Sequence, residues 1–176
     1  MRAMEPDPIG APIPHAVNFA LRPANRDDAP RLTALARAAK AHWGYPAAWL
    51  EAWQDALTIT PDYIETHTVL VANTESGARS VIGMCALEDH QDHWELAHLW
   101  VDPRAHGLGA GRALVRQVLA IAARRRPGSV VRVESDPNAA GFYQRLGARE
   151  VGSVPAPMDG DQTRTLPVFE FDSRAN

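Results

Sequence analysis

A run of alternate glycines at residues 107–111 constrains this chain more than any other segment. It follows a mostly apolar segment, residues 94–101, which has the character of a β-strand and ends at Asp102. Apolar residues then recur at helical spacing over residues 114–122. The glycines therefore lie where a strand turns into a helix. Because the first amides of a helix have no internal partner and glycine lets an anion come close, the segment predicts a pyrophosphate-binding turn.

Two other glycine-rich phosphate motifs do not fit this segment. A P-loop requires Gly-Lys followed by Ser or Thr, and residues 99–112 contain no lysine. A dinucleotide-binding fingerprint requires glycines at the first, third and sixth places, and the sixth place counted from Gly107 is Arg112. Arg104 and Arg112 supply positively charged donors close to the turn.

The rest of the chain alternates between strand-like and helix-like segments. Strands are expected at residues 19–22, 68–72, 80–87, 94–101, 130–134, 151–154 and 166–171, with a turn at 75–77 and a polar hairpin at 88–92. Further helices are expected to begin near Asp27 or Asp28, Pro46, Pro61 and Asp136. This order predicts an α/β (α+β) domain over residues 18–176, with a single mixed, mostly antiparallel sheet of six to seven strands flanked by helices. Residues 1–17 are rich in proline and predict a flexible tail.

Composition excludes several classes of function. The formal net charge of −3 gives no basic surface for nucleic acid. No stretch approaches the roughly 20 apolar residues of a membrane span, and no apolar signal core begins the chain. The single cysteine, Cys85, lies in an apolar run and is expected to be a buried structural thiol. These features favour a cytoplasmic protein with neither a nucleic-acid nor a membrane partner.

Two ordered motifs resemble the GNAT superfamily of N-acetyltransferases. The segment Arg104-x-x-Gly107-x-Gly109 matches the family's Arg/Gln-x-x-Gly-x-Gly/Ala signature. About 30 residues later, residues 136–148 resemble its second acyl-CoA segment, with an asparagine, a Phe-Tyr pair and a terminating Gly147. The resemblance extends over about residues 19–172. Two motifs in the right order are much more specific than one.

The resemblance implies an acetyl-CoA-dependent N-acetyltransferase that moves an acetyl group to a primary amine of a small molecule in a ternary complex, without a metal. In this family the strand before the turn splays from its neighbour. Its amides then bind the pantetheine arm and the thioester carbonyl, and the turn binds the pyrophosphate. The residues so assigned to acetyl-CoA are Leu99, Trp100, Val101, Arg104, His106, Gly107, Leu108, Gly109, Ala110, Gly111, Arg112, Asn138 and Phe142.

Acetyl transfer to an amine needs a base for the attacking amine and an acid for the departing thiolate. Tyr143 matches the tyrosine that many relatives use as the acid. Glu95 is expected to be the base, because several relatives place a glutamate at this position. Glu95 and Leu99 share a strand face by parity, barring a bulge. His98 is a rival base, whose parity is opposite to that of Glu95, and a water chain is a further alternative.

The acceptor pocket is assigned to Trp43 and Tyr45, because they lie between the first two helices, which commonly form the acceptor wall in this family. Arg164, near the last strand, is expected to face the same region. An aromatic group beside a cation would suit a small amine that carries a carboxylate. Of the tryptophans at positions 43, 49 and 53, two are expected to be core. His90 and His93 are interpreted as part of a polar hairpin rather than a metal site, because no further ligands are evident.

Two alternatives stay open. The chain is either a catalytic enzyme or a non-catalytic acyl-CoA-binding regulatory module, and Tyr143 favours the enzyme because a binding module needs no acid. A protein N-acetyltransferase is the other alternative, although no extended peptide-binding addition is evident. The resemblance also allows a homodimer, for which the sequence marks no interface. The identity of the acceptor amine is not given by the sequence.

Overall fold

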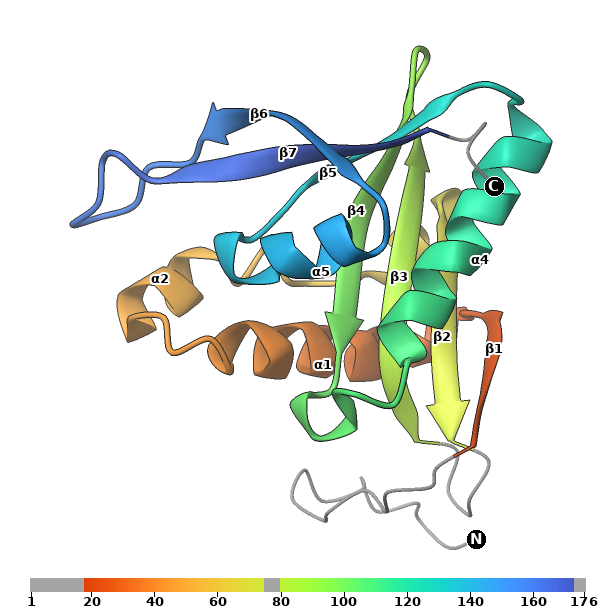
Figure 1. Cartoon of the computed structure of the whole chain (residues 1–176). Coiled ribbons are helices and arrows are strands. Elements are labelled where there is room, and N and C mark those ends of the chain that lie inside the picture. The colour runs from red at the N-terminus through yellow and green to blue at the C-terminus, as the bar shows by residue number, and fades with distance from the viewer. Residues whose placement is uncertain (1–17, 75–79, 173–176) are drawn as a thin grey trace, which may run out of the picture.

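The computed structural model describes residues 18–74 and 80–172 and shows one seven-stranded sheet (Figure 1). The strand order is β1-β2-β3-β4-β5-β7-β6, and every neighbouring pair is antiparallel except β4 and β5. The strands are β1 (Phe19–Pro23), β2 (Thr68–Thr74), β3 (Val81–Asp89), β4 (Trp94–Val101), β5 (Val130–Glu134), β6 (Arg149–Pro155) and β7 (Thr165–Asp172). The predicted mixed, mostly antiparallel sheet is confirmed.

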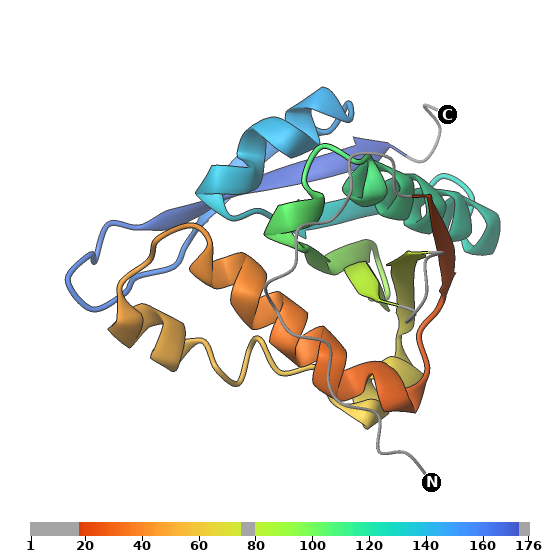
Figure 2. The same ribbon diagram turned by 90° about the horizontal axis from the view of Figure 1, so that it is seen from below.

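Helices cover both faces of the sheet. They are α1 (Ala29–Ala41), α2 (Ala47–Ala52), α3 (Pro61–Thr66), α4 (Ala110–Arg125) and α5 (Ala140–Arg145). Short 3₁₀ turns at Arg26–Asp28, Pro103–Ala105 and Pro137–Ala139 precede α1, α4 and α5. Seen from below, α1 and α2 lie on one side of the sheet, and α4 and α5 lie on the other (Figure 2). None of the helices in the described part of the chain combines the length and the apolar character needed to cross a bilayer.

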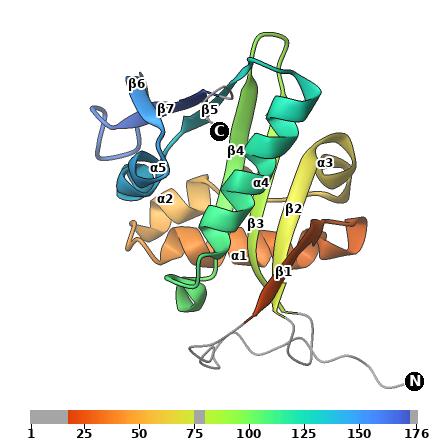
Figure 3. The ribbon, with the colours of Figure 1, turned by 45° about the vertical axis from the view of Figure 1, so that its right-hand side comes forward.

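The sheet separates two apolar cores. The larger core packs the buried face of α4 against the sheet, with Leu114, Val115 and Val118 at its centre, and it includes Tyr143 and Phe169. We call it the α4-side core. The α1-side core packs helices α1 and α3 against the opposite face of β2 and β3. Figure 3 shows α4 along one face of the sheet and α1 on the far side.

Strands β4 and β5 are joined over a short length only. Their parallel pairing is restricted to Trp94 with Val131 and Glu95 with Arg132, at the beginning of both strands. β4 remains paired with β3 as far as Val101, whereas β5 pairs on its other side with β7. The two strands therefore diverge towards their carboxyl ends, as Figure 1 shows. This opening leaves one edge of β4 without a neighbouring strand, so the main-chain groups along it lack ladder partners.

A β-bulge interrupts β4. Ala86 of β3 pairs with His98, but the next residue, Leu87, pairs with Leu96. Two residues of β3 therefore face three of β4, and Ala97 is the extra residue. Because side chains alternate between faces along a strand, one extra residue reverses the alternation beyond it.

The bulge corrects the parity expected for the proposed base. Leu96 before the bulge and Leu99 after it both pack into the α4-side core, whereas Trp100 packs into the α1-side core. Glu95 therefore points to the α1 side of the sheet, opposite to Leu99 and on the same side as His98. The expectation that Glu95 shares a face with Leu99 and opposes His98 was wrong, because it assumed an unbroken strand.

Two sequence expectations fall on residues whose placement is not described. The proposed tail at residues 1–17 and the turn at 75–77 lie outside the described residues. The other expected strands and helices are present; the ends of β4 and β5 match the expected bounds, and the other strand ends differ by no more than two residues. The helix expected at Asp136, for example, begins as a 3₁₀ turn at Pro137–Ala139 and becomes α-helical at Ala140.

Phe169 of β7 is fully buried (0% exposed) in the α4-side core and packs against Tyr143. We expect Phe169→Ala to lower the free energy of unfolding by about 3–5 kcal/mol, because it removes a large side chain and leaves a cavity. Val151→Ala, at a residue that is 44% exposed on β6, should change it by less than about 0.5 kcal/mol. Urea denaturation followed by circular dichroism measures both values. Equal effects of the two substitutions would contradict this description of the core.

Candidate active site

Between β4 and α4 the chain forms an open turn. Gly107 has a φ of 84° and Gly109 a φ of 86°, in the left-handed region that favours glycine. A Cβ atom at either position would meet nothing within 4 Å. Gly109 is the N-cap of α4, and no side chain caps this helix end. The first amides of α4 have no partner within the helix and lie in the field of the helix dipole, an arrangement that can bind a phosphate.

Gly111 has a different role from the other two glycines. It is buried, and a Cβ atom there would lie 3.3 Å from Cγ2 of Val101 and 3.4 Å from Cζ of Phe142. Glycine at this position lets the first turn of α4 pack tightly against the end of β4 and against α5. Phe142, which the sequence assigns to the cofactor site, therefore packs against Gly111 in the first turn of α4.

Charged and titratable side chains surround the turn between β4 and α4, and some of them are already paired. Asp102 caps the 3₁₀ turn through the amide of Arg104, and it binds the Arg104 guanidinium through Nη2 at 2.6 Å. Burial acts to raise the pKa of Asp102, but the hydrogen bonds and charge of Arg104, together with the charge of Arg31, lower it overall. Arg112 is exposed on the first turn of α4. The ring of His106 lies 5.5 Å from that of His42, and its pKa is lowered by burial and by this second histidine.

Tyr143 lies on α5 with its ring inside the α4-side core, and it is only 5% exposed. Its ring packs against Phe142, Phe169 and Phe171. Burial, followed by the influence of Cys85 and Asp136, raises its pKa well above the ordinary value, so the hydroxyl stays protonated at neutral pH. The chain thus holds a neutral phenol on α5, the helix that follows the diverging end of β5.

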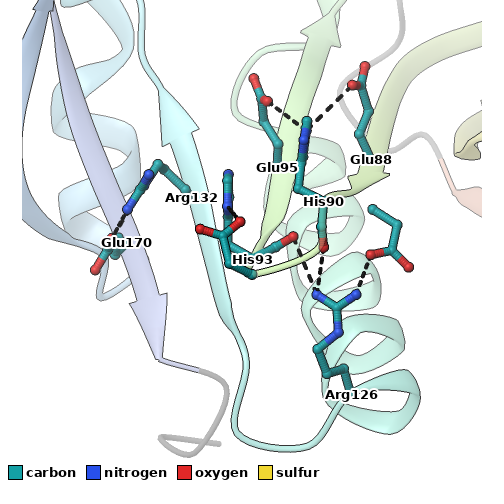
Figure 4. A network of polar contacts seen from close by, with 9 residues as sticks. Glu88, His90, His93, Glu95, Arg126, Arg132 and Glu170 are labelled. Carbon is teal, nitrogen blue, oxygen red and sulfur yellow. Dashed lines mark hydrogen bonds and ion pairs between the residues drawn. The ribbon is translucent and has the colours of Figure 1, made fainter.

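Glu95 lies in a polar group on the α1 side of the sheet. Its Oε2 is 3.1 Å from Nε2 of His90, and the carboxylate of Glu88 lies beside them (Figure 4). The Tyr63 hydroxyl donates a 2.6 Å hydrogen bond to Glu88. The ring of His98 lies 5.4 Å from that of Tyr63. The bulge is what brings His98 to the same face as Glu95.

His98 is already engaged by its neighbour on the strand. Nε1 of Trp100 donates to Nδ1 of His98 at 3.1 Å, so in the neutral ring the proton lies on Nε2. Burial lowers the pKa of His98, and the nearby Glu88 only partly opposes this effect. Accepting a further proton would break the Trp100 bond and charge a buried ring, so His98 is poorly suited to act as a base.

An aromatic cluster lies where α2 meets the segment between β6 and β7. The rings of Tyr45, Trp49 and Trp53 pack on one another at 5.1–5.8 Å. The Arg164 guanidinium lies over all three rings, at 5.2–5.9 Å, and Lys40 lies 4.2 Å from the centre of the Trp53 ring. Two cations therefore share one aromatic surface. Burial lowers the pKa of Lys40, and the charge of Arg164 adds a smaller effect in the same direction.

Asp136 ties this cluster to the start of α5. It accepts a 2.5 Å hydrogen bond from Lys40 and bonds of 2.8 and 3.0 Å from the Tyr45 hydroxyl. Burial acts to raise its pKa, but the bonds from Lys40, Asn138 and Tyr45 outweigh that effect and lower it. Asn138 also donates to the Tyr45 hydroxyl at 2.9 Å. Asn138, assigned to the cofactor from the sequence, thus lies within the network of Tyr45.

The sequence missed several members of this cluster. The sequence gives no sign of Asp136 in this cluster, and the expectation that two of the three tryptophans at positions 43, 49 and 53 are core is wrong, because none of them is buried. Trp43 lies apart: it is 39% exposed and its ring contacts His42. The contacts of Asp136 with Lys40 and Tyr45 join positions more than 90 residues apart, and no local pattern predicts such pairs.

An opened strand edge beside a glycine-bounded helix N-terminus offers main-chain groups to an extended ligand that carries a phosphate. The family model described as Acetyltransferase (GNAT) family matches residues 32–148. The chain belongs to this family and is an acetyl-CoA-dependent acetyltransferase. A comparison with curated proteins finds no match to the sequence.

Solved structures agree on the fold. A GCN5-related N-acetyltransferase from Rhodopseudomonas palustris is 21% identical with a TM-score of 0.69, covering 87% of this chain and 94% of that chain. The PaiA N-acetyltransferase from Thermoplasma acidophilum, solved in complex with coenzyme A, is 17% identical with a TM-score of 0.67. The match covers 88% of this chain and 99% of that chain. YncA from Salmonella typhimurium, a putative acetyltransferase solved with acetyl-CoA, is 19% identical with a TM-score of 0.63. The match covers 89% of this chain and 94% of that chain.

Gly109→Asp should weaken the binding of coenzyme A by about 100-fold or more, because it places a carboxylate where the phosphates are expected and like charges in a binding site cost several kcal/mol. Isothermal titration calorimetry with coenzyme A measures the change.

Gly128→Asp is the matched control, because Gly128 also has a positive φ (79°) and open surroundings but lies beyond the other end of α4. It carries the same backbone strain and should leave the affinity nearly unchanged. An equal loss in both variants would show that the effect comes from misfolding rather than from the turn.

Proposed function

We propose that this acetyltransferase transfers an acetyl group from acetyl-CoA to the primary amine of a small molecule that carries a carboxylate. The amine attacks the thioester carbonyl directly while both substrates are bound. One observation carries the choice of a small acceptor: α2 and the segment between β6 and β7 are tied together. Trp49 Nε1 donates to the Asp159 carbonyl at 2.7 Å, and Arg164 covers the three rings. An extended polypeptide would have to break these contacts in order to lie between the two segments.

The thioester arm is proposed to lie along the free edge of β4, with Leu99, Trp100 and Val101 offering main-chain groups. The pyrophosphate is proposed to lie on the turn from His106 to Arg112, where the amides of α4 are unpaired. Bound acetyl-CoA supplies an activated carbonyl. Main-chain donors on β4 would stabilise the negative charge that develops on its oxygen during attack.

Tyr143 is proposed to act as the acid. Its buried ring is held by three phenylalanines, which fixes the direction of the hydroxyl. A phenol is protonated at neutral pH, so Tyr143 has a proton to give to the departing thiolate sulfur.

Glu95 is proposed to act as the base that takes a proton from the attacking amine. Its side chain is one-third exposed and lies at the point where β4 and β5 begin to diverge. His98, the rival on the same face, is held by Trp100 and stays neutral. A carboxylate that reaches solvent can both accept the proton and release it to water.

The carboxylate of the acceptor is proposed to bind Arg164. Among the described residues Arg164 has no carboxylate within ion-pair distance, whereas Lys40 beside it is already paired with Asp136. A guanidinium stacked on three rings is well placed to hold a planar anion, because Arg binds carboxylates through two parallel hydrogen bonds.

A protein acceptor is the second candidate. The ribosomal-protein-S18-alanine N-acetyltransferase of Escherichia coli shares this fold, with a TM-score of 0.64 and 15% identity over 88% of this chain and 94% of that chain. The contacts between α2 and Asp159 argue against it.

The proposal is tested by a panel of primary amines with and without a carboxylate, together with peptides. Release of free thiol from acetyl-CoA is followed, and each product is identified by mass spectrometry. Amines that carry a carboxylate should react with the highest kcat/KM. A preference for peptides would refute the small-molecule proposal, and thiol release without acetylated product would point to hydrolysis only.

Arg164→Gln should raise the KM for the preferred amine by about ten-fold or more, the equivalent of losing one charge-assisted hydrogen bond. The KM for acetyl-CoA should change little. Arg149→Gln, an exposed arginine on β6, is the matched control and should leave both values unchanged. An unchanged KM in Arg164→Gln would rule out its role in binding the acceptor.

Tyr143→Phe should lower kcat by about 100-fold, because it removes the proposed acid while keeping the ring in the core. The Kd for acetyl-CoA should stay close to that of the unaltered protein, as calorimetry can show. Glu95→Gln should have the same signature of lower kcat and unchanged Kd. A large loss of acetyl-CoA affinity in Tyr143→Phe would identify the residue as structural.

A further inference from the structure

Three metal-ligating side chains meet at the hairpin between β3 and β4. His90, His93 and Glu95 each offer a ligand atom, and these atoms lie within 4.8 Å of one another. Among the described residues no other set of three His, Cys, Asp or Glu side chains comes together in this way. The carboxylate of Glu88 lies 3.8 Å from His90 and completes a group of four (Figure 4). Glu95, on β4 directly after the hairpin, is the further ligand that the local sequence did not reveal.

His90 provides the first sign that an ion belongs here. Its Nε2 is shielded from solvent and makes no hydrogen bond within the described part of the chain, although Oε2 of Glu95 is only 3.1 Å away. In a neutral ring an Nε2 that carries no proton is an acceptor, and so is a carboxylate oxygen. Two acceptors at this distance repel each other unless a proton or a cation lies between them.

His93 is held in the way that metal-bound histidines usually are. Its Nδ1 lies 2.7 Å from Oδ1 of Asp92. Because a carboxylate only accepts, the proton of the neutral ring lies on Nδ1, and in that tautomer Nε2 keeps its lone pair. A carboxylate behind the distal nitrogen is the common outer-shell partner of a zinc-bound histidine, where it fixes the tautomer and raises the basicity of the ligand.

The neighbouring cations do not neutralise the carboxylates of this group. Arg132 is opposite Glu95 in the register of β4 and β5, but its guanidinium binds Glu170 at 2.9 Å. Tyr63 donates a hydrogen bond to Oε1 of Glu88, which leaves Oε2 directed towards His90. Two carboxylates and two imidazoles thus share a small space with an excess of negative charge, which favours a cation.

The backbone of the hairpin is fixed from outside the group. Arg126, at the end of α4, donates to the carbonyls of His90 at 2.9 Å and His93 at 3.4 Å, and it also pairs with Asp89. The same guanidinium lies 4.9 Å from the centre of the Trp94 ring. These contacts hold the two histidines with their rings nearly parallel, 4.9 Å apart (Figure 4). The site is therefore largely preformed, which reduces the cost of binding.

We infer that His90, His93 and Glu95 form a binding site for a zinc-class divalent metal ion, with Glu88 as a fourth ligand. Two imidazoles and one or two carboxylates are a ligand set that zinc accepts. Ligand atoms around tetrahedral zinc lie about 3.3 Å apart, so binding needs only small side-chain rotations to draw the group together.

The site has a consequence for acetyl transfer that rests on the proposed function. A carboxylate bound to a metal ion no longer accepts a proton readily, so an ion held by Glu95 removes the proposed base. Occupation of the site by zinc is therefore inhibitory. This metal acts as a regulator and takes no part in the transfer itself.

Binding is tested on the full-length chain without a histidine tag, with zinc titrated by calorimetry and cobalt followed by its visible absorption. The chain should bind a single ion. His90→Gln, His93→Gln and Glu95→Gln should each weaken the affinity by at least about ten-fold. His67→Gln, at a histidine that contacts Tyr63 outside the group, is the matched control and should retain it.

Absence of zinc and cobalt binding would overturn the proposal and leave a simple ion pair between His90 and Glu95. Binding that survives both histidine substitutions would also overturn it, because the ion would then lie elsewhere. Since these measurements use no substrate, they remain informative if no amine is acetylated, in which case only the proposed function fails.

Inhibition is tested with the preferred amine, and each variant is compared with its own metal-free rate. The zinc concentration that halves turnover should rise at least about ten-fold in His93→Gln. Zinc binding that leaves turnover unchanged would refute the link between the site and Glu95.

Discussion

The loss of pairing between β4 and β5 is the constraint on which the rest of the site depends. Two parallel strands that separate after two residue pairs leave main-chain donors and acceptors without partners. The glycine turn adds a second set of amides, at the start of α4, that have no partner within the helix. Both sets lie at the carboxyl end of β4, so one extended ligand can satisfy them together. In the proposed complex, the thioester carrier forms the hydrogen bonds that the strand ladder and the helix leave open.

Side chains surround this main-chain site with different chemistry on the two faces of the sheet. Tyr143 lies with the apolar residues of the α4-side core, where burial keeps its phenol neutral. Glu95 lies on the other face, among histidines and a second carboxylate. The bulge at Ala97 makes this division possible, because it keeps Leu96 and Leu99 in one core while directing Glu95 and His98 away from it.

The local sequence predicted the elements and the turn, because helix periodicity, glycine spacing and strand patterning are short-range signals. It also indicated the family through two motifs. It did not predict the face of Glu95, since a bulge depends on pairing with β3 and has no mark in β4 alone. The packing role of Gly111 and the network of Asp136 with Lys40 and Tyr45 were missed as well, because those contacts join distant segments.

Helix α4 has the cofactor turn at one end and the β3–β4 hairpin at the other. Its first turn begins directly after Gly109. At the other end, Arg126 follows the last turn and donates hydrogen bonds to the carbonyls of His90 and His93. Sixteen residues of α-helix make a stiff rod of about 24 Å. Both ends of this rod therefore belong to one rigid element, so the glycine turn and the hairpin that carries His90 and His93 have a fixed position relative to each other. A substitution that bends α4 would therefore alter the spacing between the proposed carrier site and the hairpin next to β4.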